Sequence, residues 1–233
     1  MKQFSNRYIF IFSTVMVIIV ATILSMAATL LQPRQQKNLE IEKKKSMLES
    51  INIPADRRNA EELYDKYIKE SKVLNSSGEE VSGVDAFSIE MKAEQKKPEN
   101  SQNLALFFAT PDDGEKVTII PLEGKGLWGP IWGYISLKPD LNTIYGITFD
   151  HKGETPGLGA EINTSWFESQ FKGMTLFDAG KFVSVQVLKS NEKPIEHHSV
   201  DAISGGTITS KGLQRMLYDC IVKYEDYLKK NAE

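Results

Sequence analysis

The sequence predicts an α+β protein in which one transmembrane helix precedes a mixed α+β domain. Three patterns indicate this class: a long apolar run near the N-terminus, short glycine-punctuated runs of β-branched and aromatic residues from Leu104 onward, and an amphipathic stretch that ends the chain. Strands that follow one another, with helices at their edges, are typical of α+β domains.

Composition limits what the protein can be. Its 233 residues are 41% hydrophobic and 25% charged, which suits one well-packed main domain. The net charge of −3 offers no basic surface for phosphates and so excludes a nucleic-acid-binding protein. Cys220 is the only cysteine, so the chain alone cannot build a disulfide or a cysteine-clustered metal site. It lies on an apolar helical stripe and is predicted to be a small buried residue rather than a reactive thiol. His151 and the pair His197-His198 also lack the spacing of a metal site.

The N-terminal segment, residues 1–33, predicts a membrane anchor. No charged residue lies between Arg7 and Arg34, and the apolar run from Tyr8 to Leu31 exceeds the roughly 20 residues that a helix needs to cross a lipid bilayer. A cleaved signal peptide is the alternative, but its apolar core is typically about 7–15 residues long. Basic residues flank the run on both sides, so they leave its orientation open.

Residues 34–103 are predicted to form a connecting region. The charged stretch from Gln32 to Ser50 indicates a short helix or stalk, and an amphipathic pattern predicts a helix from about Asp56 to Lys72. Asn75 to Asn103 mixes short apolar runs with Lys, Glu, Gln and Pro, which predicts an exposed, variable excursion with strand fragments.

The main domain spans residues 104–233. A helix is expected near Ile162 to Phe171, and the stripe that carries Cys220 predicts a C-terminal helix from Lys211 to Lys230. The expected strands are Leu104–Ala109, Val117–Pro121, Trp132–Leu137, Thr143–Phe149 and Phe182–Leu188.

Two glycine-bearing segments of this domain have the residue types of a ligand site. The stretch from Gly124 to Tyr134 carries two tryptophans that could stack on a ligand, although a tight turn with buried tryptophans is favoured. The stretch from His151 to Gly159 gathers a carboxylate, a hydroxyl and free amides on a loop, which suits a polar planar ligand. It equally suits a plain strand-to-helix connection with a solvated Glu154.

A third segment, Asp201 to Ser210, directly precedes the C-terminal helix. Its composition favours a turn followed by a Thr or Ser N-cap. Its position also suits phosphate, because free amides and the helix dipole stabilise an anion at a helix N-terminus. A threonine hydroxyl here could therefore hold a phosphate-bearing cofactor.

Together, the run from Phe149 to Gly159 and the run from Ser204 to Ser210 resemble the FMN-binding domain family. More narrowly, they are similar to the C subunits of the Na+-translocating NADH:quinone oxidoreductases. The resemblance implies that a flavin transferase esterifies Thr207 with the phosphate of FMN, and that no residue is a catalytic acid or base. Gly206 stands where the family usually has alanine. The other implied cofactor-binding residues are Ser204, Gly205, Gly206, Thr209, Glu154, Thr155, Gly157 and Leu158.

The resemblance also implies a place in the cell and a role. The α+β domain would lie on the external, periplasmic side of the inner membrane. Its covalent FMN would relay electrons from an iron–sulfur centre to a second FMN on a membrane-embedded partner protein, on the way from NADH to ubiquinone and coupled to sodium export. Two alternatives stand beside this role: the G subunit of an Rnf-type ion-translocating ferredoxin:NAD+ oxidoreductase, and a membrane-tethered structural or binding domain without redox chemistry.

Overall fold

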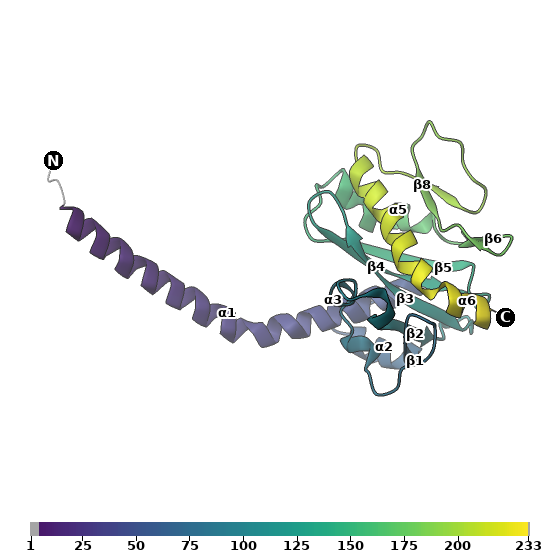
Figure 1. The fold of residues 1–233 in the computed structure, drawn as a ribbon, viewed down its shortest axis with the longest axis horizontal. Coiled ribbons are helices and arrows are strands. Elements are labelled where there is room, and N and C mark those ends of the chain that lie inside the picture. The colour runs from purple at the N-terminus through teal and green to yellow at the C-terminus, as the bar shows by residue number, and fades with distance from the viewer. Residues whose placement is uncertain (1–4, 233) are drawn as a thin grey trace. The chain divides into compact units, whose positions relative to one another are not determined.

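The computed structural model describes residues 5–232 and confirms the α+β class (Figure 1). The chain forms two compact units, one up to Lys43 and one from Lys44 onward. The first unit is helical, and the second holds a five-stranded sheet with helices and two small two-stranded sheets.

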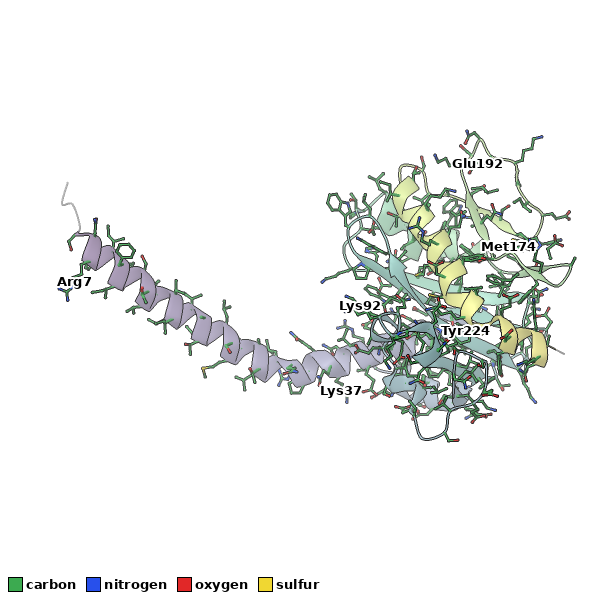
Figure 2. All side chains as sticks on the ribbon, viewed as in Figure 1. Arg7, Lys37, Lys92, Met174, Glu192 and Tyr224 are labelled. Carbon is green, nitrogen blue, oxygen red and sulfur yellow. The ribbon has the colours of Figure 1, made fainter. Side chains whose placement is uncertain are left out.

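One long helix, α1 (Asn6–Ser50), contains the predicted membrane anchor. Within it lies a stretch that is long and apolar enough to cross a membrane and is not buried by the rest of the protein. Figure 2 labels Arg7 and Lys37 on either side of this apolar part. The charged segment after Gln32 does not form a separate short helix, because it continues α1 to Ser50.

The central sheet is an antiparallel meander in the order β1-β2-β3-β4-β5. Four of its strands were predicted from the sequence, and three of these extend further than the apolar runs indicated. The strands are β1 (Ile68–Leu74), β2 (Leu104–Ala109), β3 (Val117–Lys125), β4 (Pro130–Leu137) and β5 (Ile144–His151).

A C-terminal helix, α5 (Thr207–Ile221), lies across one face of this sheet (Figure 1). Its buried stripe, which includes Leu213, Leu217 and Cys220, packs in one core cluster with sheet residues such as Ile120 and Leu122. The predicted helix from Lys211 to Lys230 is thus present, but it begins at Thr207. A 3-10 turn, η4 (Val222–Tyr224), separates it from α6 (Glu225–Asn231).

The end of α1 covers the opposite face of the sheet. Met47, Leu48 and Ile51 are fully or almost fully buried there. The Thr148 hydroxyl donates to the Ser46 carbonyl at 3.1 Å, and the Ser136 hydroxyl donates to the Ser50 carbonyl. Since both faces of the sheet are covered, strands β3 and β5 are buried along six consecutive residues each instead of alternating between buried and exposed positions.

The connecting region differs from its prediction in two places. The helix expected from Asp56 to Lys72 ends early, because α2 spans Ala60–Tyr67 and β1 follows at once, paired with β2. Pairing with a neighbouring strand outweighs the helical pattern of this mostly polar stretch. The excursion holds three short helical turns rather than strand fragments: η1 (Ala86–Ser88), α3 (Met91–Glu94) and η2 (Glu99–Ser101).

The segment between β5 and α5 is irregular. The predicted helix near Ile162 to Phe171 is split into η3 (Gly159–Asn163) and α4 (Ser165–Ser169). The predicted strand from Phe182 to Leu188 is interrupted at Ser184, whose φ of 59° lies outside the strand region. Its pieces join two small sheets, which are made of β6 (Phe177–Asp178) with β7 (Lys181–Phe182), and β8 (Gln186–Leu188) with β9 (Ser199–Asp201).

Candidate functional site

Glu154 joins the three glycine-bearing segments that the sequence singles out. One of its carboxylate oxygens, Oε1, accepts the backbone N–H of Trp128 at 2.9 Å, and the other, Oε2, accepts the Thr209 hydroxyl at 2.6 Å. The residue is only 4% exposed, so the alternative of a solvated Glu154 is wrong. Two motifs that lie about fifty residues apart in the sequence, around Glu154 and Thr209, therefore meet at one carboxylate.

Two glycines make room for this carboxylate. A Cβ atom at Gly126 would lie 2.5 Å from Oε1 of Glu154, and a Cβ at Gly159 would lie 2.5 Å from Oε2. Such approaches are far inside van der Waals contact, so neither position accepts a larger residue without moving Glu154. Glycine at these positions is thus required by packing, apart from any role in binding a ligand.

The two threonines of the third segment face opposite surroundings. Thr207 is the first residue of α5 and is exposed, whereas Thr209 is 1% exposed and donates its hydroxyl to Glu154. The helix was expected to begin after Ser210. It begins earlier because the Ser210 N–H already donates to the Gly206 carbonyl at 2.9 Å, and the Ser210 hydroxyl turns inward to accept the Ile203 N–H at 3.3 Å. No Thr or Ser side chain caps the helix, and Gly206 is its N-cap residue.

A tight turn holds the residues just before Thr207. The Gly206 N–H donates to the Ile203 carbonyl at 3.0 Å, and Gly205 has a φ of 73°, in the left-handed region that favours glycine. A Cβ at Gly205 would lie 2.5 Å from Cδ2 of Leu158, so the side chain of Leu158 rests against this turn. Ser204 is exposed beside it.

Thr155 and Gly157 shape the loop that carries Leu158. The Thr155 carbonyl accepts the N–H groups of Leu158 and Ala160, both at 3.1 Å. Gly157 has a φ of 76°, and its N–H donates to Oε1 of Glu161 at 2.9 Å. Both Thr155 and Gly157 are exposed, so the loop is ordered through its backbone and leaves its outer surface open.

Exposed apolar side chains lie on all three of the segments that Glu154 joins. Trp128 is 69% exposed at the tip of the β3–β4 hairpin, and Ile208 is 59% exposed on the first turn of α5. Leu127 and Leu158 are exposed as well. The prediction of buried tryptophans is therefore wrong for Trp128. Sequence reasoning also missed Leu127 and Ile208; Ile208 is recognisable as an apolar residue that lies off the buried stripe of its helix.

The sole cysteine lies apart from this surface. Cys220 is fully buried, and its sulfur accepts the Glu123 N–H at 3.4 Å. Burial raises the pKa of the thiol to about 11, so it stays protonated and inert at neutral pH. The prediction of a small buried residue is confirmed.

Comparison with known proteins matches this site to a family. Residues 126–222 match the FMN-binding domain family, and this range includes the hairpin tip, the Glu154 loop and Thr207. The chain is 32% identical over 211 residues to the C subunit of the Na(+)-translocating NADH-quinone reductase of Haemophilus ducreyi, covering 84% of this chain and 82% of that one. It is 31% identical over 218 residues to the corresponding protein of Vibrio parahaemolyticus, covering 84% and 83% of the two chains.

Comparison with solved structures gives the same match as comparison of sequences. The crystal structure of the C subunit of the Na(+)-translocating NADH-quinone reductase from Parabacteroides distasonis superposes with a TM-score of 0.78 at 43% sequence identity, covering 85% of this chain and 96% of that chain. Shewanella oneidensis NqrC superposes with a TM-score of 0.69 at 26% identity, covering 82% and 98%. The narrower of the two resemblances found in the sequence is thereby confirmed.

Proposed function

The chain belongs to the family of C subunits of the Na+-translocating NADH-quinone reductases, and from this premise we propose that it carries FMN esterified to Thr207 and passes electrons within that complex. The observation that carries the proposal is the contrast between two hydroxyls on one helical turn. Thr207 is open to a modifying enzyme, whereas the Thr209 hydroxyl is buried and bonded to Glu154. A flavin transferase can reach only the first of them.

The surroundings of Thr207 fit the phosphate of FMN. The first helical hydrogen bond of α5 joins Ser210 to Gly206, so the amides of Thr207, Ile208 and Thr209 are the orphan donors of the first turn. Such amides and the helix dipole stabilise an anion next to the Thr207 side chain. Gly206 at the N-cap is buried, and a Cβ there would lie 3.0 Å from Cγ2 of Ile203, so glycine lets the turn before Thr207 pack closely.

The surroundings also fit the flavin ring. Exposed apolar surface is offered by Trp128, Leu127, Leu158 and Ile208 on the three segments that Glu154 joins, and the hydrogen bonds of Glu154 hold the hairpin tip beside the first turn of α5. Bound FMN supplies the redox chemistry, because its ring accepts and releases electrons. The protein's own residues anchor the phosphate, present apolar contacts to the ring and exclude water from its faces.

The membrane anchor and the family support a proposal for the location. The apolar part of α1 holds the protein in the lipid bilayer, with its α+β domain on the external side, where a covalent link keeps the cofactor from being lost. There the domain exchanges electrons with an iron–sulfur centre and with a membrane-embedded partner that carries a second FMN, on the way from NADH to ubiquinone and coupled to sodium export. The names of the relatives support a place in a sodium-translocating NADH-quinone reductase.

Removing the anchor tests this division of roles. Deleting residues 1–36 should leave a soluble, folded protein that still accepts flavin, because burial in the second unit begins only near the end of α1. Deleting residues 1–51 removes Met47, Leu48 and Ile51 from the covered face of the sheet and should abolish folding. Circular dichroism and in-gel flavin fluorescence measure both outcomes. Aggregation of the shorter deletion in an unfolded state would contradict the boundary.

Covalent attachment is tested with matched threonine variants. The full chain, co-expressed with a flavin transferase, should show flavin fluorescence after denaturing electrophoresis and an FMN mass on the peptide that contains Thr207. Thr207→Ala should lose both signals, whereas Thr209→Ser should keep them. A label that follows Thr209 would overturn the assignment, and the absence of any covalent flavin would favour a structural role without redox chemistry.

The ring contacts have a separate test. Thr155→Ala and Leu158→Ala should leave FMN covalently bound but change its fluorescence or its midpoint potential, because only the surroundings of the ring change. If both substitutions leave the spectrum and the potential unchanged, the Glu154–Gly159 loop is structural and the binding site shrinks to the threonine motif.

A further inference from the structure

A groove of about 810 Å³ lies along α5, between the Lys125 end of β3 and the segment around α3. It is distinct from the proposed flavin site, since neither Thr207 nor Glu154 nor Leu158 lines it. Figure 2 labels Lys92, the residue that α3 contributes to its rim.

The groove exists because β3 extends well beyond its pairing with β2. β2 pairs with β3 only from Val117 to Ile119, so the Glu123 end of β3 has no strand on that side. Side chains replace the missing strand: Nε2 of Gln95 donates to the Glu123 carbonyl at 2.8 Å, and the Cys220 sulfur accepts the Glu123 N–H. Because these side chains satisfy the backbone N–H and carbonyl of Glu123, this end of β3 needs no neighbouring strand and the groove beside it stays open.

Its lining is positively charged in an acidic protein. The whole chain has a net charge of −3, yet five basic side chains line the groove against three acidic ones. Lys92, Lys125 and Arg215 form no ion pair or hydrogen bond through their side chains with any residue between 5 and 232. Three cations on separate elements thus face one hollow without an ion pair of their own, and the basic excess of the lining favours an anionic occupant.

The spacing of the cations favours an extended occupant. Arg215 and Lys223 are eight residues apart along α5 and η4, or about 12 Å at 1.5 Å per helical residue. About four residues of extended peptide span that length, so such a segment can place carboxylates along the whole row of cations. The acidic residues Glu123 and Asp219 lie between the cations and would repel a uniformly anionic lipid surface. A peptide can place its carboxylates so as to avoid them.

We infer that this groove binds an acidic, extended segment of another protein of the same complex. This inference rests on the proposed function only in so far as the complex must exist; it does not require the flavin. Contacts of this kind act mainly by steering and orienting a partner, so their strength falls as salt concentration rises.

Zero-length cross-linking of the assembled complex tests the contact directly. A carbodiimide joins a lysine to a carboxylate only when the two touch, so mass spectrometry should find Lys92 or Lys125 linked to an Asp or Glu of another protein of the complex. Lys189 and Lys193, exposed between β8 and β9, are the internal controls and should not form such links. Links from Lys92 and Lys125 only to their own chain, or as often as from the controls, would overturn the inference.

Matched charge reversals test the energetics. Lys92→Glu with Arg215→Glu should lower co-purification of the other proteins of the complex about tenfold at low ionic strength, which corresponds to ~1.4 kcal/mol. Lys189→Glu with Lys193→Glu makes the same change in net charge and should have no effect. Equal losses in both double variants would contradict a specific groove. Loss of binding to phosphatidylglycerol vesicles, with the cross-links to other proteins intact, would assign the groove to lipid and overturn the inference.

Covalent flavin on Thr207, measured in the same samples, separates this inference from the proposed function. Both double variants should keep the flavin of the unmodified protein, since no changed residue lies in the site around Thr207. A protein that lacks flavin but still cross-links through Lys92 would refute the flavin proposal and leave the groove assignment standing.

Discussion

Two buried carboxylates organise loops in different parts of the chain, and they are satisfied in different ways. Glu94, in the excursion between β1 and β2, accepts the Asn103 N–H at 2.9 Å and the Lys97 ammonium at 2.7 Å. Glu154, in the family motif, accepts only the neutral donors of Trp128 and Thr209 among the residues that the structure describes. A carboxylate held by neutral donors alone depends on each of them, because no nearby cation compensates for a lost bond.

The difference matches the roles of the two regions. The excursion has to close a surface loop, and the partly exposed ion pair between Lys97 and Glu94 is enough for that purpose. The motif has to hold a hairpin tip, a loop and a helix start in one arrangement around Thr207. Directional hydrogen bonds to a buried acceptor fix such an arrangement more sharply than a long, flexible cation does.

The largest effect is expected from Glu154→Ala. The substitution leaves two donors without their acceptor and opens a void between three segments, so it should lower the free energy of unfolding by about 3 kcal/mol. It should also reduce flavin attachment at Thr207, because the first turn of α5 loses its support. Urea unfolding and in-gel flavin fluorescence measure the two effects. A stable Glu154→Ala protein with full flavin content would remove the distinction drawn between the two carboxylates.

Thr209→Val should have the second largest effect on the free energy of unfolding. Valine keeps the shape of threonine but removes the hydroxyl that donates to Glu154, so a buried carboxylate oxygen loses its partner at a cost of about 1–3 kcal/mol. Thr209→Ser keeps the donor and is the matched control. Similar denaturation midpoints for the two variants would show that packing, rather than the hydrogen bond, matters at this position.

A third carboxylate, that of Glu168, extends the comparison to the pH dependence of stability. Burial, and then the nearby charges of Glu49 and Asp150, raise the pKa of Glu168 to about 7 although the Phe149 N–H donates to it at 2.7 Å. Between about pH 4.5 and 7 the folded protein therefore holds a proton that the unfolded chain has lost, and stability should fall as pH rises. Glu168→Gln should flatten this dependence by about 1–2 kcal/mol, allowing for partial exposure.

Thermal denaturation of the wild type and Glu168→Gln across this pH range measures the effect. Glu94 should behave in the opposite way. Although burial opposes the shift, the Asn103 N–H and the Lys97 ammonium hold the pKa of Glu94 below its usual value, so its contribution is lost only as pH falls through that lowered pKa. Identical pH profiles for the wild type and Glu168→Gln would show that Glu168 stays ionised in the fold.

The smallest effect is expected from Glu94→Ala. Its loop is exposed, and the Lys97 pair is screened by solvent, so unfolding should become easier by about 1 kcal/mol or less. Flavin attachment should be unchanged, because the excursion lies outside the site around Thr207. A loss of flavin in this variant would link the two regions and contradict their separation.

Local patterns determined much of this protein without its tertiary structure. The anchor in α1, strand β2 and the buried stripe of α5 follow from the length and periodicity of apolar residues, which a single segment displays by itself. The resemblance to the FMN-binding family rests in the same way on two short motifs. Each of these features depends on neighbours in the sequence.

Contacts between distant segments decided the rest. The polar stretch after Ile68 became β1 because β2 offered a pairing edge, and Trp128 became exposed because Glu154 holds the backbone of the hairpin tip. Thr207 and Thr209 are alike in sequence, and only the packing of α5 against the Glu154 loop exposes one and buries the other. Sequence patterns indicate which residues prefer burial, but the assembled fold determines which hydroxyl a carboxylate from another segment reaches.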